Sequence, residues 1–269
     1  MTRRSALFLS LAATAQPKQI TASEIIERIK KGVAVPWRAE TVDTLKTGTP
    51  ETPITGIATT FMSTLDVLQR AVAQGKNMII THEPTFYTHD DNIKDTASDP
   101  TVIAKKLFIE KNNIAVFRFH DHWHMRRPDG IRVGMLNELG WQNGEPKNVS
   151  LKQLAGDIKA KLNIRAIRVI GDPSQIINKI SLNPGYASLP GSIRALNNAD
   201  VLIIGEAREW EVYEFVQDQI AAGSKKSLIV LGHSVSEEGG MKECAAWLKT
   251  LISEVPIAHI PAGEPFWTL

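Results

Sequence analysis

An alternation of apolar runs and helical segments between residues 54 and 119 decides the fold. The runs that read as buried strands are ITGIATTF (54–61), IIT (79–81) and IAVFRF (114–119). Between them, one helix is predicted to open at Ser63 and stop at Gly75, and another to begin at Pro100. A β-α-β-α-β series of this kind implies parallel strands joined by right-handed crossovers.

A second α/β series follows a loop at residues 141–148. Its predicted strands are 166–170, 177–182, 201–204 and 228–231. One predicted helix begins after Ser150, and two others cover residues 192–196 and 209–222. There are too few regular βα units for an eight-stranded barrel, so two α/β halves with mostly parallel sheets fit better. We expect the first half at residues 20–135 and the second at 136–230. The remaining segment, 231–269, with a helix at 241–251 and an edge strand at 257–260, is expected to return and complete a metal site on the strand rim between the halves.

Composition argues against several classes of protein. Apolar residues make up 43% of the 269-residue chain and charged residues 22%, which is unlike disordered or fibrous proteins. Lys and Arg number 31 against 29 Asp and Glu, and this near balance gives no electrostatic case for nucleic-acid binding. No stretch is long enough to span a membrane. The single cysteine, Cys244, is expected to be a small core residue, so any metal must be held by His, Asp and Glu.

The N-terminal residues have the pattern of an export signal. Arg3 and Arg4 precede an apolar stretch that continues to Ala15, and Ala13-Thr14-Ala15 has the form of a cleavage site. The paired arginines resemble a twin-arginine signal. We expect residues 1–16 to form this signal, with a mature chain that starts near Gln16 and works in the periplasm or another exported location. An ordinary frayed N-terminus on a cytoplasmic protein is the alternative.

Five of the seven histidines fall in three short clusters, each directly after a predicted strand. The clusters are Thr81-His82-Glu83-Pro84, His120-Asp121-His122-Trp123-His124 and Gly232-His233-Ser234-Val235-Ser236-Glu237. The carboxyl ends of parallel strands share one rim, which is where such folds bind ligands. Imidazoles and carboxylates gathered there suit a divalent transition metal. Each cluster alone is a weak signal, but three at successive strand ends predict a metal centre.

The spacing within two of the clusters suggests how they bind. An extended chain would point His120, His122 and His124 to the same side, which is a chelating arrangement. His82 and Glu83 offer a nitrogen and an oxygen ligand at a strand tip. Ordinary hydrogen-bonded histidines and a solvated loop are the alternatives.

The third cluster has helical spacing. His233 and Glu237 are four residues apart, which fits one helical turn or a tight loop that enters a helix at Gly239. The remaining histidines, His89 and His259, belong to no cluster and are expected to be structural or surface residues.

Two further features follow predicted strands. Glu206 is expected to be an acid/base or orienting group of the site. The alternative is that it is simply a carboxylate at the start of a helix, where the helix dipole favours negative charge. The turn Pro184-Gly185-Tyr186-Ala187-Ser188 is rich in small residues and could turn backbone N–H groups toward an anion. It lacks the lysine of a phosphate-binding loop, so this signal is weak.

The order of these motifs resembles that of the Nif-three-like family, whose members are also named type two GTP cyclohydrolase homologues. The resemblance covers roughly residues 23–266 and is carried by Thr41-Val42-Asp43-Thr44-Leu45, Thr81-His82-Glu83-Pro84, the segment His120 to His124, Gly205-Glu206, Gly232-His233 with Glu237, and Glu264-Pro265-Phe266. It implies two α/β halves around a dinuclear metal centre, commonly assembled into ring-shaped hexamers. It also implies a hydrolase role.

The sequence departs from the family pattern at two positions. Members usually carry two adjacent histidines where this chain has His82-Glu83, and a metal-bridging aspartate where this chain has His124. An imidazole cannot easily bridge two ions. Either Asp121 or Glu83 takes the bridging role, or the site holds one metal. The resemblance therefore does not transfer GTP cyclohydrolase activity to this chain.

We expect a metal-dependent hydrolase with one or two divalent ions such as Zn, Fe or Mn. The expected ligands are His82, Glu83, His120, His124, His233 and Glu237, and the expected proton-transfer groups are Glu206 or His122. The metal would activate water against an unidentified small substrate, with a nucleotide- or phosphoester-like molecule favoured. The main alternative is a non-catalytic metal-binding scaffold or regulatory oligomer, which would have a closed rather than an open coordination shell. An amidohydrolase-type barrel ranks last.

Overall fold

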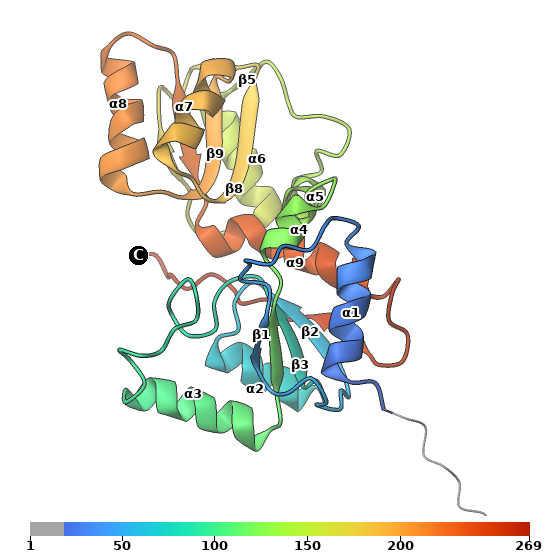
Figure 1. Cartoon of the computed structure of the whole chain (residues 1–269). Coiled ribbons are helices and arrows are strands. Elements are labelled where there is room, and N and C mark those ends of the chain that lie inside the picture. The colour runs from blue at the N-terminus through green and yellow to red at the C-terminus, as the bar shows by residue number, and fades with distance from the viewer. Residues whose placement is uncertain (1–18) are drawn as a thin grey trace, which may run out of the picture.

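The computed structural model describes residues 19–269, so the export signal predicted for residues 1–16 lies outside the described residues. The described chain forms two α/β halves, one above the other in Figure 1, with helices between them. The expected α/β class with mostly parallel sheets is confirmed. None of the helices in this part of the chain combines the length and the apolar character that a membrane span requires.

The sheet of the first half has five strands. Their spatial order is β1 (Leu45–Thr47), β4 (Ala115–Arg118), β3 (Met78–Thr81), β2 (Ile57–Thr60) and β11 (Ile257–His259), and β1 alone runs antiparallel to its neighbour. Because β11 comes from the C-terminal segment, the chain returns to the first half after it has built the second.

Helices cover both faces of this sheet. α1 (Ala22–Gly32) and α9 (His233–Leu248) pack on one face, while α2 (Leu65–Ala73) and α3 (Pro100–Lys111) pack on the other. Along β3 the side chains alternate, with Met78 and Ile80 in the first of these cores and Ile79 in the second. The crossover helices bring β2, β3 and β4 to an end at the same rim.

The second half repeats this plan with a smaller sheet. Its strands are, in spatial order, β6 (Arg168–Ile170), β10 (Ser227–Val230), β9 (Val201–Glu206) and β8 (Ile180–Tyr186), with β6 antiparallel. One face is covered by α6 (Leu151–Leu162), and the other by α7 (Leu189–Asn198), the π-helical turn η1 (Glu209–Tyr213) and α8 (Glu214–Ala221). A separate two-stranded ribbon pairs β5 (Val149–Ser150) with β7 (Ile176–Ile177).

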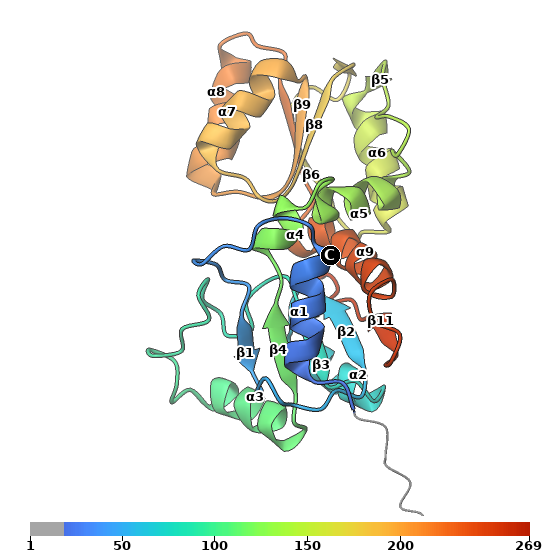
Figure 2. The same cartoon turned by 45° about the vertical axis from the view of Figure 1, so that its right-hand side comes forward.

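Three helices join the halves: α4 (Asp121–Met125), α5 (Gly130–Leu139) and α9 (Figures 1 and 2). α9 begins directly after β10 of the second half and packs on the first sheet, where the carbonyl of Met241 accepts a 2.7 Å hydrogen bond from Thr59. Because α4 follows β4 and α9 follows β10, strand ends from both halves meet at this junction.

The segment after β4 differs from the sequence prediction. The extended chain considered for His120, His122 and His124 is not what the structure shows, because His120 precedes the short helix α4 and the next five residues form it. The carboxylate of Asp43 accepts the backbone N–H groups of His120, Asp121 and His122 at 2.7, 2.9 and 2.9 Å. This distant carboxylate satisfies the free donors of the first turn and so favours a helix here.

The last helix also begins earlier than predicted, at His233 rather than at Met241. Gly239 and Gly240 suggested a break, yet both are helical. They lie where α5 crosses α9, and a Cβ on Gly240 would come 2.5 Å from Ile131. Glycine is therefore required here for close helix packing, not for a turn.

Candidate metal centre

The six predicted metal ligands come together at the junction of the halves. His82 and Glu83 follow β3, His120 and His124 lie one turn apart at α4, and His233 and Glu237 lie one turn apart at the start of α9. Ligand atoms of His82, His120 and His124 lie within 4.8 Å of one another, and so do those of His82, Glu83 and Glu237. The helical alternative for His233 and Glu237 is therefore the one that the structure adopts.

Glu237 lies among three of the imidazoles. Its Oε2 atom is 3.1 Å from Nε2 of His233 and 3.4 Å from Nε2 of His82. Its other oxygen, Oε1, is 3.9 Å from Nε2 of His124. The side chain is 3% exposed, and a carboxylate so far removed from water requires positive or hydrogen-bonding partners.

Glu83 lies between His120 and His233, so His233 faces both carboxylates. Its Oε1 atom is 3.6 Å from Nε2 of His120 and 3.8 Å from Nε2 of His233. Its Oε2 atom is 3.4 Å from Nη2 of Arg118, a fully buried residue of β4 whose Nε also donates to the carbonyl of His82. Burial raises the pKa of Glu83, and the positive charge of Arg118 acts in the opposite direction.

Every imidazole of the cluster has an acceptor at Nδ1. The acceptors are the carbonyl of Phe119 for His82 (3.2 Å), Asp121 for His120 (3.0 Å), Asp129 for His124 (3.0 Å) and Glu206 for His233 (3.1 Å). An acceptor at Nδ1 favours the tautomer with the proton on that atom and leaves the Nε2 lone pair free for a metal. The four Nε2 atoms are also the atoms that face the two carboxylates.

The buried Nε2 atom of His82 indicates that a cation fits this site. Within the described residues its Nε2 atom is buried and makes no hydrogen bond. Buried polar atoms without a partner are rare, and Oε2 of Glu237 lies 3.4 Å away. A divalent cation between these atoms would satisfy both. The donor set of imidazole nitrogens and carboxylate oxygens suits Zn, Fe or Mn, and the thiol of Cys244 lies in the hydrophobic core.

Burial and neighbouring charges divide the imidazoles into two pairs. Burial holds the pKa of His82 well below its usual value and also lowers that of His120, so both rings are neutral at pH 7. Burial opposes charge on His233 as well, but the surrounding glutamates raise its pKa to about 9. Burial acts likewise on His124, yet the hydrogen bond to Asp129 raises its pKa. A cation that binds at His233 at neutral pH must therefore displace a proton.

The second half borders the site with backbone. A Cβ on Gly185, near the end of β8, would lie 2.2 Å from Oε1 of Glu237. The φ of this residue is 78°, and its N–H donates to the hydroxyl of Ser236 at 2.9 Å. Both the left-handed backbone and the close approach require glycine. The small-residue turn of the sequence thus forms one wall of the cluster.

Glu206 lies at the edge of the cluster. Its Oε1 atom is 3.1 Å from Nδ1 of His233, and its side chain is 52% exposed. The geometry matches the expected orienting contact with His233, and the carboxylate is open to solvent. Glu206 ends β9 and η1 begins only at Glu209, so the helix-start alternative does not describe it.

His122 lies outside the cluster. Its ring is fully buried and stacks on Trp37, with 3.6 Å between the ring centroids. Its Nδ1 atom is 2.7 Å from Asp43, and its Nε2 accepts the backbone N–H of Arg38 at 3.0 Å. Because α4 is helical, His122 points away from His120 and His124. Both ring nitrogens are occupied, so the proton-transfer role expected for His122 has no support in this geometry.

Asp121, one candidate for the bridging carboxylate, lies behind His120. It faces the Nδ1 atom of that ring at 3.0 Å and accepts a 2.8 Å hydrogen bond from the hydroxyl of Thr41. It is therefore on the far side of the imidazole from Nε2. Of the two carboxylates proposed for the bridge, Glu83 is the one that faces the centre.

Three residues that support the site were not predicted to do so from the sequence, although Asp43 lies in one of the segments that carry the family resemblance. Asp43 holds the start of α4, Arg118 holds Glu83, and Asp129 holds His124. Asp129 precedes Gly130 at the start of α5 and is readable as a helix cap. The other contacts join segments far apart in the chain, so local patterns carried no signal for them.

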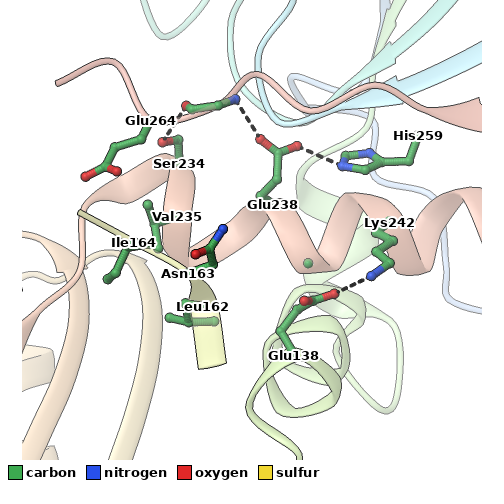
Figure 3. Close-up of a pocket in the computed structure, with 12 residues that line it drawn as sticks. Glu138, Leu162, Asn163, Ile164, Ser234, Val235, Glu238, Lys242, His259 and Glu264 are labelled. Atoms are coloured by element: carbon green, nitrogen blue, oxygen red, sulfur yellow. Dashed lines mark hydrogen bonds and ion pairs between the residues drawn. The ribbon is translucent and has the colours of Figure 1, made fainter. Parts of the chain in front are cut away.

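A separate pocket lies on another face of α9 (Figure 3). It has a volume of about 270 Å³ and is lined by both halves. Glu238 lies there, 3.1 Å from Nε2 of His259, and Lys242 pairs with Glu138 at 2.8 Å. His259 thus contacts a glutamate next in sequence to a candidate ligand, yet it is not part of the cluster.

Comparison with protein families gives one match over most of the chain. The model of Duf34/NIF3 (NGG1p interacting factor 3) matches residues 20–263. Two proteins named GTP cyclohydrolase 1 type 2 homolog are also similar. That of Clostridium acetobutylicum is 25% identical over 195 residues, or 65% of this chain and 69% of the relative. That of Chlamydia pneumoniae is 26% identical over 245 residues, or 82% and 90%.

Solved structures have the same fold. A Bacillus cereus protein related to NIF3 superposes with a TM-score of 0.77 at 14% identity and covers 94% of this chain and 100% of that one. A hypothetical protein of Staphylococcus aureus gives a TM-score of 0.75 at 19% identity, with coverage of 94% and 100%. At these identities the likeness concerns the fold alone.

Proposed function

The chain belongs to the Duf34/NIF3 family, and on this premise we propose that it is a metal-dependent hydrolase of a small nucleotide- or phosphoester-like molecule. The proposal rests on the four imidazoles whose Nδ1 atoms are bonded to acceptors while their Nε2 atoms face two carboxylates. The side chains of His120, His124 and His233 are 23%, 31% and 23% exposed. A purely structural metal site is closed, so this open side favours a site that admits substrate.

We assign six residues to holding one or two divalent ions: His82, Glu83, His120, His124, His233 and Glu237. When bound, such an ion would lower the pKa of a coordinated water toward about 7 and would polarise substrate oxygens. If two ions bind, Glu83 and Glu237 are the carboxylates that lie between imidazoles and can be shared. Arg118 favours the charged form of the Glu83 carboxylate and orients it.

We assign proton exchange to Glu206. Its carboxylate is bonded to Nδ1 of His233 and is 52% exposed, so it connects an imidazole of the centre to bulk water. This role is compatible with orienting His233, because one oxygen suffices for the hydrogen bond.

The substrate class has two supports. The relatives' name, GTP cyclohydrolase 1 type 2 homolog, refers to a nucleotide. Divalent ions of this kind also polarise phosphoryl oxygens, so a phosphoester would be drawn to the centre by charge. From the family resemblance we further propose a homo-oligomer, with a hexamer as the expected form. Light scattering tests this, and a mass of one chain, 29.7 kDa, would contradict it.

The test is a hydrolysis screen with nucleoside phosphates and nitrophenyl phosphate esters, using protein purified without chelator. We expect hydrolysis that disappears after chelation and returns with metal. Glu237→Gln should abolish it, while Glu238→Gln, the next residue on a different face of α9, should not. Metal retained without turnover of any substrate would favour the scaffold alternative. Full activity in Glu237→Gln would contradict the assigned site.

A further inference from the structure

The chain beyond Glu206 carries an aromatic and basic surface beside the metal centre. Tyr186 pairs in register with Glu206 across β8 and β9, and the N–H of Ala187 donates to the Glu206 carbonyl at 2.8 Å. Arg208 follows two residues later in extended conformation, and Trp210 follows it in η1. Because Glu206 itself contacts His233, these side chains originate within a few residues of the cluster.

A hydrogen-bond network organises this surface. The carboxylate of Glu211 accepts from Nη1 of Arg208 at 3.0 Å and from the hydroxyl of Tyr186 at 3.4 Å. The guanidinium of Arg208 also lies 5.9 Å from the ring centroid of Trp210. The carboxylate of Glu211 thus links Arg208 to Tyr186, and Trp210 lies beside the same guanidinium.

The rings are available to a ligand. Trp210 is 75% exposed and Tyr186 is 45% exposed. Trp210 lies on a π-helical turn, a rare element that occurs frequently at functional sites. Gly185, the residue before Tyr186, carries no side chain over Glu237 that would separate this surface from the centre.

We propose that Tyr186, Arg208 and Trp210 form the recognition site for a small anionic molecule with a flat ring, a nucleoside phosphate or a compound of that class. The ring stacks on Trp210 or Tyr186, and the anionic group lies between Arg208 and the metal centre. Exposed aromatic side chains bind flat rings through their π-faces, and a guanidinium pairs with phosphate oxygens. This inference rests on the proposed function for the reaction that the bound molecule would undergo. Its own claim is that the molecule binds at these three side chains.

The overall charge favours a single nucleotide over a polymer. Lys and Arg exceed Asp and Glu by only two residues, and the side chains near Arg208 include the acidic Glu209 and Glu211. A nucleic-acid strand requires a row of unpaired basic residues along its backbone. One guanidinium beside two rings matches one phosphate and one base.

The test measures binding to the metal-loaded protein by calorimetry with three kinds of probe. The probes are the four nucleoside 5′-monophosphates, the corresponding nucleosides, and ribose 5-phosphate, which lacks the ring. We expect at least one mononucleotide to bind more tightly than its nucleoside and than ribose 5-phosphate. Trp210→Ala should weaken that mononucleotide by roughly five- to a hundredfold and leave ribose 5-phosphate unchanged.

Arg208→Gln should have the complementary effect and weaken both phosphate-bearing probes without changing the nucleoside. Trp267→Ala removes another exposed tryptophan, 73% exposed, and should change nothing. Trp210→Phe should recover part of the loss, which a merely misfolded loop would not do. Metal content, measured on each variant, distinguishes a loss of nucleotide binding at these side chains from a loss caused by damage to the metal centre.

Two results would overturn the inference. One is unchanged mononucleotide binding in both Trp210→Ala and Arg208→Gln with normal metal content. The other is tighter binding of a short oligonucleotide than of any mononucleotide, which would point to a polymer. Wild-type protein that binds a mononucleotide through Trp210 and Arg208 but shows no hydrolysis or holds no metal would count against the proposed function. The proposed recognition site would still stand.

Discussion

The Nδ1 atom of His124 lies 3.0 Å from Oδ2 of Asp129, whose other oxygen caps helix α5. One side chain therefore starts a helix and orients a candidate metal ligand. Oδ1 accepts the N–H groups of Ile131 and Arg132 at 2.8 and 3.1 Å, which fixes the carboxylate in place. The arrangement couples the geometry of the metal centre to the packing of α5 on α9.

We predict that Asp129→Asn impairs metal binding without unfolding the protein. The amide oxygen can still cap α5, but the amide nitrogen would donate to Nδ1 of His124. The imidazole would then carry its proton on Nε2 and lose the lone pair that faces Glu237. We expect affinity for Zn to fall by roughly 10- to 100-fold in a chelator competition assay.

The matched control for this variant is Asp99→Asn. Asp99 caps α3 through a 2.7 Å hydrogen bond to the N–H of Thr101, outside the metal centre. It should leave metal affinity unchanged. Equal affinities of wild type and Asp129→Asn would show that the His124 tautomer does not matter.

Arg118→Met is predicted to destabilise the fold strongly. The guanidinium is fully buried and pairs with Oε2 of Glu83, and its removal takes the positive partner from that oxygen and the donor from the His82 carbonyl. Breaking a buried ion pair on one side costs about 3–5 kcal/mol, to be measured by urea denaturation. Arg28→Met, which removes an exposed pair with Glu254, should destabilise the fold far less, because surface ion pairs contribute little. Similar losses in the two variants would contradict the assigned role of Arg118.

Metal affinity is predicted to rise with pH between about 7 and 9. His233 has a pKa raised to about 9, so at neutral pH a metal must displace its proton. His82 and His120 have lowered pKa values and add no such requirement. The apparent dissociation constant should therefore fall as pH increases and level off above about pH 9. An affinity that is constant from pH 7 to pH 9 would refute this assignment.

The same shift has an opposite consequence for the metal-free protein. A raised folded-state pKa stabilises the fold fully below the unfolded value of 6.5, and this contribution is lost as pH rises through about 9. Thermal unfolding of chelated protein should therefore show a contribution from His233 that declines over this window. His233→Gln should remove it.

Cys244 is predicted to be unreactive in the folded protein. The thiol is buried in the core beside α1, and burial raises its pKa, so almost no thiolate forms at neutral pH. A thiol reagent should label no site in native protein and one site in denaturant. Rapid labelling of native protein would show that α9 opens.

The export signal remains a prediction from the sequence. We expect mass spectrometry of the mature protein to find a new N-terminus near Gln16, and replacement of Arg3 and Arg4 by lysine to block export. A chain that keeps residues 1–15 in the cytoplasm of its native host would contradict it.

Much of the fold and the cluster could be predicted because both follow from strand order. Apolar runs before His82, His120 and His233 identified buried strands, and the ends of parallel strands lie at one rim. That rule required no knowledge of loops. It located the candidate ligands without specifying which ring atoms would face one another.

The conformation after β4 could not be predicted from local pattern. Alternating histidines fit an extended chain, but Asp43, distant in sequence, supplies the acceptor that makes residues 121–125 helical. One consequence is that His122 faces Trp37 instead of the cluster. The orienting contacts of Asp129 and Arg118 likewise depend on tertiary packing.

The most direct test is elemental analysis of wild-type protein and two histidine variants purified without chelator. We predict one or two equivalents of a divalent transition metal in the wild type, a clear loss in His233→Ala, and no change in His259→Ala, whose ring pairs with Glu238 outside the cluster. Metal-free wild-type protein that takes up no ion on addition, or undiminished metal in His233→Ala, would contradict the account.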